Sequence, residues 1–125
     1  MIFDTNALSA YADGDPNLLK LIRTAKRHQL PTIVLGEYRF GLLRSRERLA
    51  RESWLVRLEL ECDVLDVNRQ TAICYAEIRE ELRSLGRPIP ENDIWIAAIA
   101  REHQLSILSR DQHFDQVPGL ARFGW

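Results

Sequence analysis

The chain lacks several features that would each have indicated a class of protein. Its longest apolar run, residues 94–100, is far shorter than the roughly 20 residues of a membrane-spanning helix. Its first residues carry no basic, apolar and small-residue pattern typical of a secretory signal peptide. Only two cysteines, Cys62 and Cys74, are present, and they do not form a CxxC pair. These absences predict a cytoplasmic protein without a membrane segment, whose thiols are buried or idle.

Three catalytic signatures are also missing. The sequence has no Walker lysine motif, no G-x-G-x-x-G and no nucleophile elbow. The histidines show no metal-ligand spacing with one another, and all three are expected at the surface. His28 and His103 are expected to end helices, where a positive charge suits the helix dipole, and His113 is expected in a loop.

Lysine is scarce, since only Lys20 and Lys26 are lysines among the 17 basic residues. Several of the arginines crowd one stretch: Arg39, Arg44, Arg46, Arg48 and Arg51. Two interpretations stay open for them, a solvated helix face paired with nearby glutamates, or a surface for RNA or an acidic partner. The net charge of −1 does not by itself indicate nucleic acid.

What is present indicates one globular domain over residues 1–125, since 46% of the residues are hydrophobic and 28% charged. Strand-like and helix-like segments alternate along the chain, which predicts an α/β fold, an α/β/α sandwich around a mostly parallel sheet. The expected strands cover residues 1–3, 30–35, 63–67, 105–109 and 120–125. The expected helices cover residues 15–29, 36–46, 46–61, 69–86 and 91–100.

The segment PENDIWIAAIA, residues 90–100, predicts a helix that is apolar nearly all round and hence buried. It begins with the polar residues Glu91, Asn92 and Asp93. They can act as helix caps, or they can deliver a carboxylate into a site. The segment alone does not decide between these two interpretations.

Four acidic residues lie where the expected sheet has its carboxyl edge. Asp4 ends the first strand, and Glu37 follows the second by two residues, in the first turn of its helix. Asp93 opens the buried helix, and Asp111 follows the fourth strand by two residues. Each can be an ordinary turn or cap residue, but ligands of such sheets bind at this edge. Clustered carboxylates need a proton or a cation, and oxygen ligands favour Mg²⁺ or Mn²⁺.

At these residues the sequence resembles the PIN-domain nucleases, in particular the VapC-type toxins of toxin–antitoxin pairs. The resemblance rests on the segments FDTNAL, TIVLGEYRFG, PIPENDIWIAAIA and LSILSRDQHFDQVPGL, and it spans almost the whole chain. It implies a Mg²⁺- or Mn²⁺-dependent endoribonuclease that cleaves structured RNA (tRNA, rRNA or mRNA) and blocks translation. It also implies a homodimer and a cognate antitoxin that covers the site.

The resemblance assigns roles residue by residue. Asp4, Glu37, Asp93 and Asp111 match the acidic catalytic and metal-binding positions, and Thr5, Asn6 and Ser109 match polar residues that hydrogen-bond the acids. Arg39 and Arg44 are candidates for RNA contacts. Glu91 and Asp115 are spare acids, expected to cap, to form a turn or to face solvent. Trp54 and Tyr75 are candidates for a dimer interface, with ordinary core packing as the alternative.

Two other classes of protein share some of these features. A phosphoacceptor receiver-type domain also gathers acids at a sheet edge, but it needs a lysine late in the chain, and both lysines precede residue 27. The alternative that stays open is a catalytically inactive PIN-like module that binds RNA or a protein partner.

Overall fold

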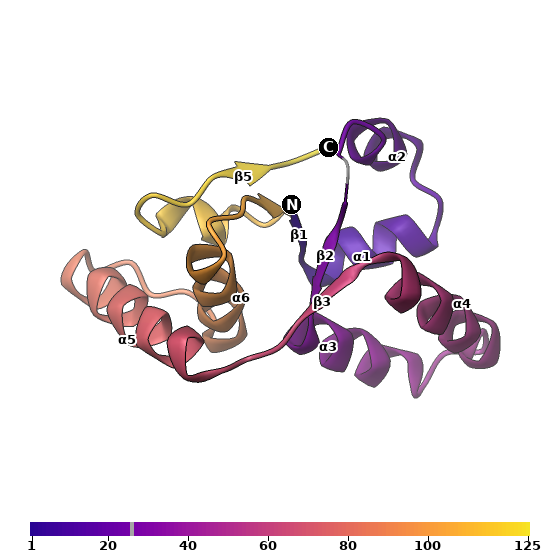
Figure 1. The fold of residues 1–125 in the computed structure, drawn as a ribbon, viewed down its shortest axis with the longest axis horizontal. Helices are drawn as coiled ribbons and strands as arrows, with labels where there is room; N and C mark the ends of the chain where they lie inside the picture. The colour runs from indigo at the N-terminus through magenta and orange to yellow at the C-terminus, as the bar shows by residue number, and fades with distance from the viewer. Residues whose placement is uncertain (26) are drawn as a thin grey trace.

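In the computed structural model, which describes residues 1–25 and 27–125, the chain folds around a five-stranded sheet. The strand order is β3-β2-β1-β4-β5, and each pair of neighbours is parallel (Figure 1). Because the strands are parallel, their carboxyl ends share one edge of the sheet. The strands are β1 Ile2–Phe3, β2 Gln29–Pro31, β3 Asp63–Leu65, β4 Ile107–Leu108 and β5 Arg122–Phe123.

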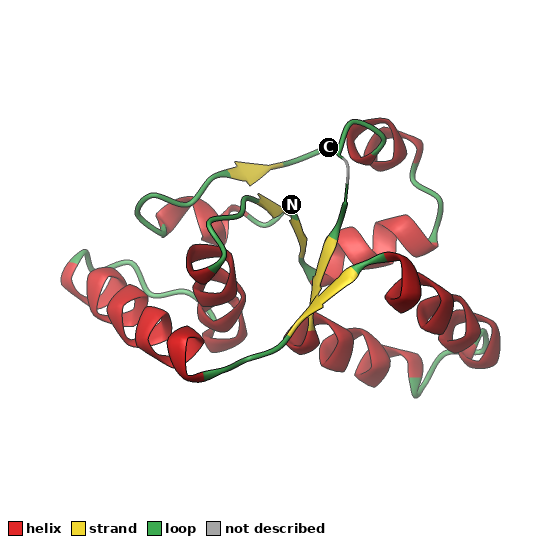
Figure 2. Cartoon of the chain, in the orientation of Figure 1, coloured by secondary structure: helices red, strands yellow, loops and turns green. Residues whose placement is uncertain are grey.

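Helices cover both faces of the sheet, which confirms the predicted α/β/α sandwich. Figure 1 shows α5 and α6 on one side of strands β1 to β3 and α1, α3 and α4 on the other, and Figure 2 shows the strands in yellow between them. The chain runs from β1 through β2 to β3 and then returns to β4 on the other side of β1, and the right-handed crossovers usual for parallel strands put the helices of these two halves on opposite faces. The helices are α1 Thr5–Ala12, α2 Pro16–Ile22, α3 Thr32–Leu42, α4 Arg48–Glu61, α5 Arg69–Ser84, α6 Glu91–Glu102 and the 3₁₀ helix η1 Gln112–Gln116. Within the described residues, no helix combines the length and the apolar character that crossing a membrane requires.

Local signals set several helix ends as predicted. Asp15 caps α2 by accepting hydrogen bonds from the amides of Asn17 and Leu18, and Pro16 occupies its first position. Asn68 opens α5 with a capping box, and Gly86 takes a left-handed conformation (φ 63°) just after the helix.

The strand predicted over residues 30–35 is wrong in its second half. The strand ends at Pro31, whose ring cannot donate a ladder hydrogen bond, and α3 begins at Thr32. Val34, Leu35 and Tyr38 then bury one face of α3 against the core. Burial at helical spacing therefore outweighs the strand preference of the β-branched residues. Glu37 accordingly lies beyond the first turn of its helix and not in it.

Two further boundaries differ from the sequence prediction. The helix expected over residues 15–29 ends at Ile22, and Lys26 of that segment lies outside the described residues. Helix α1, which immediately follows Asp4, was not predicted from sequence at all. Its Ala7 and Leu8 are fully buried, so α1 is stabilised largely by packing on the core.

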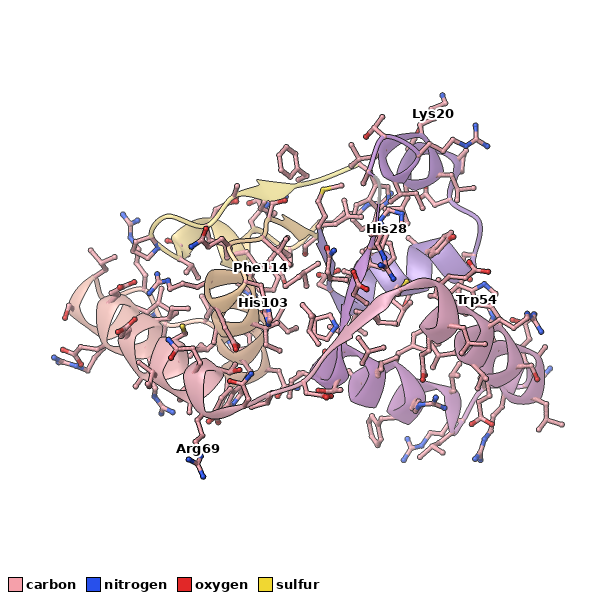
Figure 3. All side chains as sticks on the ribbon, in the orientation of Figure 1. Lys20, His28, Trp54, Arg69, His103 and Phe114 are labelled. Carbon is pink, nitrogen blue, oxygen red and sulfur yellow. The ribbon has the colours of Figure 1, made fainter. Side chains whose placement is uncertain are left out.

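His28 is expected at the surface, but in the structure its ring packs against the core. This residue lies just before β2 and stacks on the ring of Phe3, with centroids 5.1 Å apart (Figure 3). Its Nδ1 is buried without a hydrogen-bond partner among the described residues, and burial lowers the pKa of the imidazole. Cys62 and Cys74 are buried free thiols, as predicted.

Candidate metal centre

Asp4 is the most buried acid of the predicted site, with only 3% of its surface exposed. It follows β1 and caps α1, because its Oδ1 accepts a hydrogen bond from the Ala7 amide at 2.7 Å. Its other oxygen, Oδ2, accepts from the hydroxyl of Ser109, which follows β4. The neighbouring strands β1 and β4 thus hold this carboxylate in one orientation at the carboxyl edge.

The first turn of α6 does not use its polar side chains as caps. The residue before it, Pro90, makes no side-chain cap bond, and the three side chains of the turn point elsewhere. Glu91 accepts from the Tyr75 hydroxyl at 2.8 Å, Asn92 donates to Glu37 at 2.7 Å, and Asp93 contacts His113. The capping interpretation is therefore not supported, and the helix directs Asp93 toward other acids.

Asp111 is linked to Asp4 and to Asp93 through two intermediate side chains. The Ser109 hydroxyl that donates to Asp4 also accepts the Asp111 amide at 2.8 Å. On the other side, Nδ1 of His113 lies 3.0 Å from Oδ1 of Asp111 and 3.2 Å from Oδ2 of Asp93. One ligand atom from each of Asp93, Asp111 and His113 lies within 4.8 Å of the other two.

Glu37 reaches the same site from α3. Its Oε2 accepts a hydrogen bond from the Thr5 hydroxyl, and its Oε1 accepts from the Asn92 amide. The two donors are the sequence neighbours of Asp4 and Asp93. The structure therefore brings together the four predicted acids, Asp4, Glu37, Asp93 and Asp111, which we call the acidic cluster.

Burial and the repulsion between neighbouring carboxylates disfavour the ionised forms of Asp4 and Asp93. Burial above all, and the charges of Asp93 and Asp111, raise the pKa of Asp4 from its ordinary 3.8 to about 6, against the hydrogen bonds from Ser109 and Ala7. Burial, with the charges of Asp111 and Glu37, also raises the pKa of Asp93, although the His113 contact opposes that shift. Carboxylates in this state are stabilised by a proton or by a cation.

The residues present fit a divalent cation. The donors of the acidic cluster are oxygens, which hard cations such as Mg²⁺ and Mn²⁺ prefer, and His113 adds one nitrogen that transition metals accept. A cation between Asp93 and Asp111 would offset the repulsion that raises the pKa of Asp4 and Asp93. The donor set therefore supports a metal centre and does not name the metal.

Other predicted site residues lie outside the acidic cluster. Asn6 is exposed and is hydrogen-bonded to no acid among the described residues. Arg39 forms an ion pair with Glu59 at 2.6 Å, and Arg44 is exposed. Arg48 and Arg51 are also paired with acids. For the three paired arginines, Arg39, Arg48 and Arg51, this supports the interpretation as a solvated helix face.

The two spare acids have other partners. Glu91 bonds the Tyr75 hydroxyl, and Asp115 forms two 2.8 Å hydrogen bonds with Arg122. The interface candidates Trp54 and Tyr75 make intrachain aromatic contacts. Trp54, labelled in Figure 3, packs against Tyr11 and Tyr38, and Tyr75 stacks on Trp95 with centroids 4.0 Å apart.

Sequence reasoning missed two residues of this site. His113 is at the surface as predicted, but it lies in η1 instead of a loop, and its contacts with Asp93 and Asp111 are not predicted from sequence. Its position two residues after Asp111 was the available signal. Asn92 was considered only as a helix cap, yet it orients Glu37.

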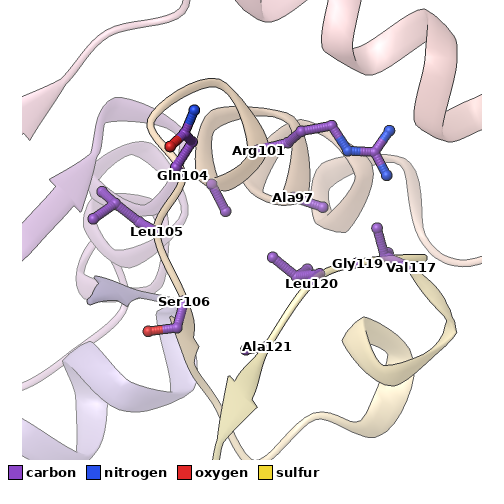
Figure 4. Close-up of a pocket in the computed structure, with 10 residues that line it drawn as sticks. Ala97, Arg101, Gln104, Leu105, Ser106, Val117, Gly119, Leu120 and Ala121 are labelled. Atoms are coloured by element: carbon purple, nitrogen blue, oxygen red, sulfur yellow. The ribbon is translucent and has the colours of Figure 1, made fainter.

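A cavity of about 500 Å³ lies at the edge of the sheet opposite the acidic cluster, where β4 and β5 begin (Figure 4). Ala97 and Arg101 of α6 and Leu120 are among its lining residues, and no member of the acidic cluster lines it. The Arg101 guanidinium is bound by both oxygens of Glu81, at 3.0 and 2.8 Å. The charged group of this cavity is therefore already paired with a carboxylate.

Comparison with known proteins agrees with this geometry. The family model "PIN domain" matches residues 1–120. The ribonuclease VapC5 of Mycobacterium tuberculosis is 33% identical over 91 residues, 71% of this chain and 67% of the relative. The ribonuclease VapC2 of Rickettsia felis is 26% identical over 129 residues, 99% of this chain and 96% of the relative.

A solved structure has the same fold over the whole chain. In the crystal structure of VapBC2 from Rickettsia felis bound to a promoter DNA fragment, one chain superposes with a TM-score of 0.85 at 25% identity. The match covers 100% of this chain and 99% of the other. The chain therefore belongs to the PIN-domain family, in its VapC branch.

Proposed function

We propose that the protein is a metal-dependent endoribonuclease, the toxin of a VapC-type toxin–antitoxin pair, which cleaves structured RNA and thereby inhibits translation. The observation that carries the proposal is the acidic cluster, in which the nearly buried Asp4 meets Asp93 and Asp111 at the carboxyl edge of the sheet. The names of the relatives, which are ribonucleases, support the same activity.

In this proposal Asp4, Asp93 and Asp111 hold Mg²⁺ or Mn²⁺, and Glu37 completes the set or orients the attacking water. When bound, the ion lowers the pKa of water and neutralises charge that develops on the phosphate. Thr5 and Asn92 fix Glu37, and Ser109 fixes Asp4, so these carboxylates are oriented before RNA binds. In-line attack by water would leave a 5′-phosphate and a 3′-hydroxyl.

The experiment that tests the proposal is incubation of the purified protein with total RNA from its host, with Mg²⁺, with Mn²⁺ or with EDTA. We expect metal-dependent cuts at a few sites in single-stranded loops, whose backbone can reach a groove. Arg39 and Arg44 would be tested as phosphate contacts in the same assay. Products that end in 2′,3′-cyclic phosphate would contradict attack by water. Intact RNA in every condition would favour an inactive RNA- or partner-binding module.

The same proposal includes a cognate antitoxin, as in the VapBC complex of Rickettsia felis. Phe40 of α3 is 73% exposed and lies one helical turn from Glu37, so an apolar segment docked there could bring a basic side chain to the acids. Adding the antitoxin is expected to stop RNA cleavage. Cleavage that continues with the antitoxin bound would contradict a covered site.

A homodimer remains part of the proposal, and the exposed apolar side chains of α4 support it. Leu49 and Leu60 are 81% and 83% exposed and lie with Val56 on one face of the helix. We expect light scattering to give twice the 14.5 kDa mass of the chain, and the double change Leu49→Arg and Leu60→Arg to give the single mass. A wild-type monomer at high concentration would contradict this interface.

A further inference from the structure

A cavity of about 430 Å³ adjoins the acidic cluster and is not used by the chemistry described above. Asp111 belongs to both, because it is an acid of the cluster and also lines this cavity. Pockets of a few hundred Å³ are the size that takes a small-molecule or nucleotide group. We call it the Arg110 cavity, after the basic side chain that lines it.

One wall of the Arg110 cavity is a rigid, flat cation. The guanidinium carbon of Arg110 lies 4.5 Å from the centroid of the Trp125 ring. Oδ2 of Asp15 accepts from both groups, from Nη2 of Arg110 at 2.9 Å and from the Trp125 indole N–H at 3.2 Å. Asp15 is itself fixed as the cap of α2. The guanidinium is thus held on two sides, yet 53% of the Arg110 side chain stays exposed.

A polar stripe also lines the cavity. Asn6 and Ser9 of α1 and Asp13, the C-terminal cap of that helix, follow one another at helical spacing. Arg51 binds Oδ1 of Asp13 at 2.7 Å, and no described residue donates to its Oδ2. The stripe therefore offers a carboxylate acceptor, an amide and a hydroxyl to a ligand that lies on the Arg110 plane.

The charges of the cavity disfavour a phosphate as its occupant. Asp13, Asp15 and Asp111 line it, against the single guanidinium of Arg110. A nucleobase meets the same groups favourably, since bases stack on guanidinium planes and their amino groups donate to carboxylates. Guanine presents an imino and an amino donor on one edge, whereas uracil presents a single donor between two acceptors.

We infer that the Arg110 cavity is a nucleobase subsite, which takes the base next to the cleaved bond, stacks it on Arg110 and reads its donor edge with Asp13. The inference rests on the proposed ribonuclease function. Because Asp111 borders the cavity and Asn6 is two residues from Asp4, a base held there places its own backbone beside the acidic cluster. The subsite selects guanine over uracil at one position flanking the cut.

The test uses an RNA library with a randomised single-stranded loop, which is cleaved by wild type and by four variants. Three of them are Arg110→Ala, Arg110→Lys and Asp13→Asn. The fourth, Arg69→Ala at the exposed start of α5, is the matched control. We expect Arg110→Ala to raise KM about 10-fold, the effect of losing one stacked base. Arg110→Lys should raise it nearly as much, because lysine keeps the charge without the plane. Asp13→Asn should erase the guanine preference with little change in kcat, and Arg69→Ala should change neither KM nor base preference.

Binding of the same RNA to metal-free protein in EDTA, followed by fluorescence anisotropy, separates the two proposals. If wild type cuts no RNA, the ribonuclease proposal fails, and a weaker binding by Arg110→Ala than by wild type still supports the subsite. Full rescue by Arg110→Lys would mean a simple charge contact and would overturn the subsite. The subsite would also be overturned if Arg110→Ala had a lower melting temperature but unchanged base preference and RNA affinity. Arg110 would then serve only to hold Trp125 in place.

Discussion

Replacing Asp93 by asparagine is expected to lower RNA cleavage at least ~100-fold, because a metal site contributes several kcal/mol to the transition state. Asparagine keeps the size of the side chain and one acceptor oxygen but removes the negative charge that would hold the cation. The carboxylate lies at the start of α6, where only 18% of its side chain is exposed and His113 and Asp111 are its neighbours.

The fold is expected to tolerate this change. Asp93 makes no cap bond to α6, and the charge of Asp111 opposes its ionisation, so removing its own charge relieves repulsion. We therefore expect the melting temperature of Asp93→Asn in EDTA to equal or exceed that of wild type. Calorimetric titration with Mn²⁺ should show weaker binding by the variant.

Glu91→Gln is the matched control, since Glu91 lies two residues earlier in the same helical turn and bonds Tyr75 instead of the acidic cluster. It should cleave RNA at a rate close to that of wild type. If Asp93→Asn unfolds, the carboxylate serves the helix and not the chemistry. If it cleaves at the wild-type rate, Asp93 is not a metal ligand.

The acidic cluster could be predicted largely because parallel strands share a carboxyl edge. Asp4 and Asp111 follow β1 and β4, which are hydrogen-bonded neighbours, so their proximity follows from strand order. For Glu37 the predicted edge and the predicted helical state are both confirmed, but the helix begins at Thr32 and not after residue 35, so the residue is not in its first turn. The residue lies within α3 and reaches the site because the whole helix packs against α1 and α6.

The features of the fold and the site that could not be predicted from sequence depend on contacts between residues far apart in the chain. The strands β1 and β4 have two residues each, too few for an alternating pattern. Helix α1 contains small and polar residues and gains its stability from the core and from the Asp4 cap. The contact of Arg110 and Asp15 with Trp125 joins three separate segments, and no local spacing signals it.

Replacing Asp4 by asparagine is expected to stabilise the metal-free protein above pH 6. Burial raises the pKa of Asp4 from 3.8 to about 6, so the folded state binds a proton more tightly than the unfolded chain. The contribution of protonated Asp4 to the free energy of unfolding is thus fully present below about pH 4, and it is lost as the pH rises through 6. A shift of about two pKa units, which already includes the opposing Ser109 and Ala7 hydrogen bonds, corresponds to at most about 3 kcal/mol.

A divalent cation should reverse this order, because it binds the ionised carboxylate of the folded state only. Urea unfolding from pH 4 to 8, in EDTA and with Mn²⁺, measures both effects, and exposed Asp66→Asn is the control. In EDTA the advantage of Asp4→Asn should grow between pH 4 and 6 and then level off, whereas Mn²⁺ should stabilise wild type far more than the variant. A variant less stable than wild type at pH 7.5 in EDTA would mean that the cap and the Ser109 bond outweigh the burial of charge. Equal stabilisation of both proteins by Mn²⁺ would mean that the cation binds elsewhere.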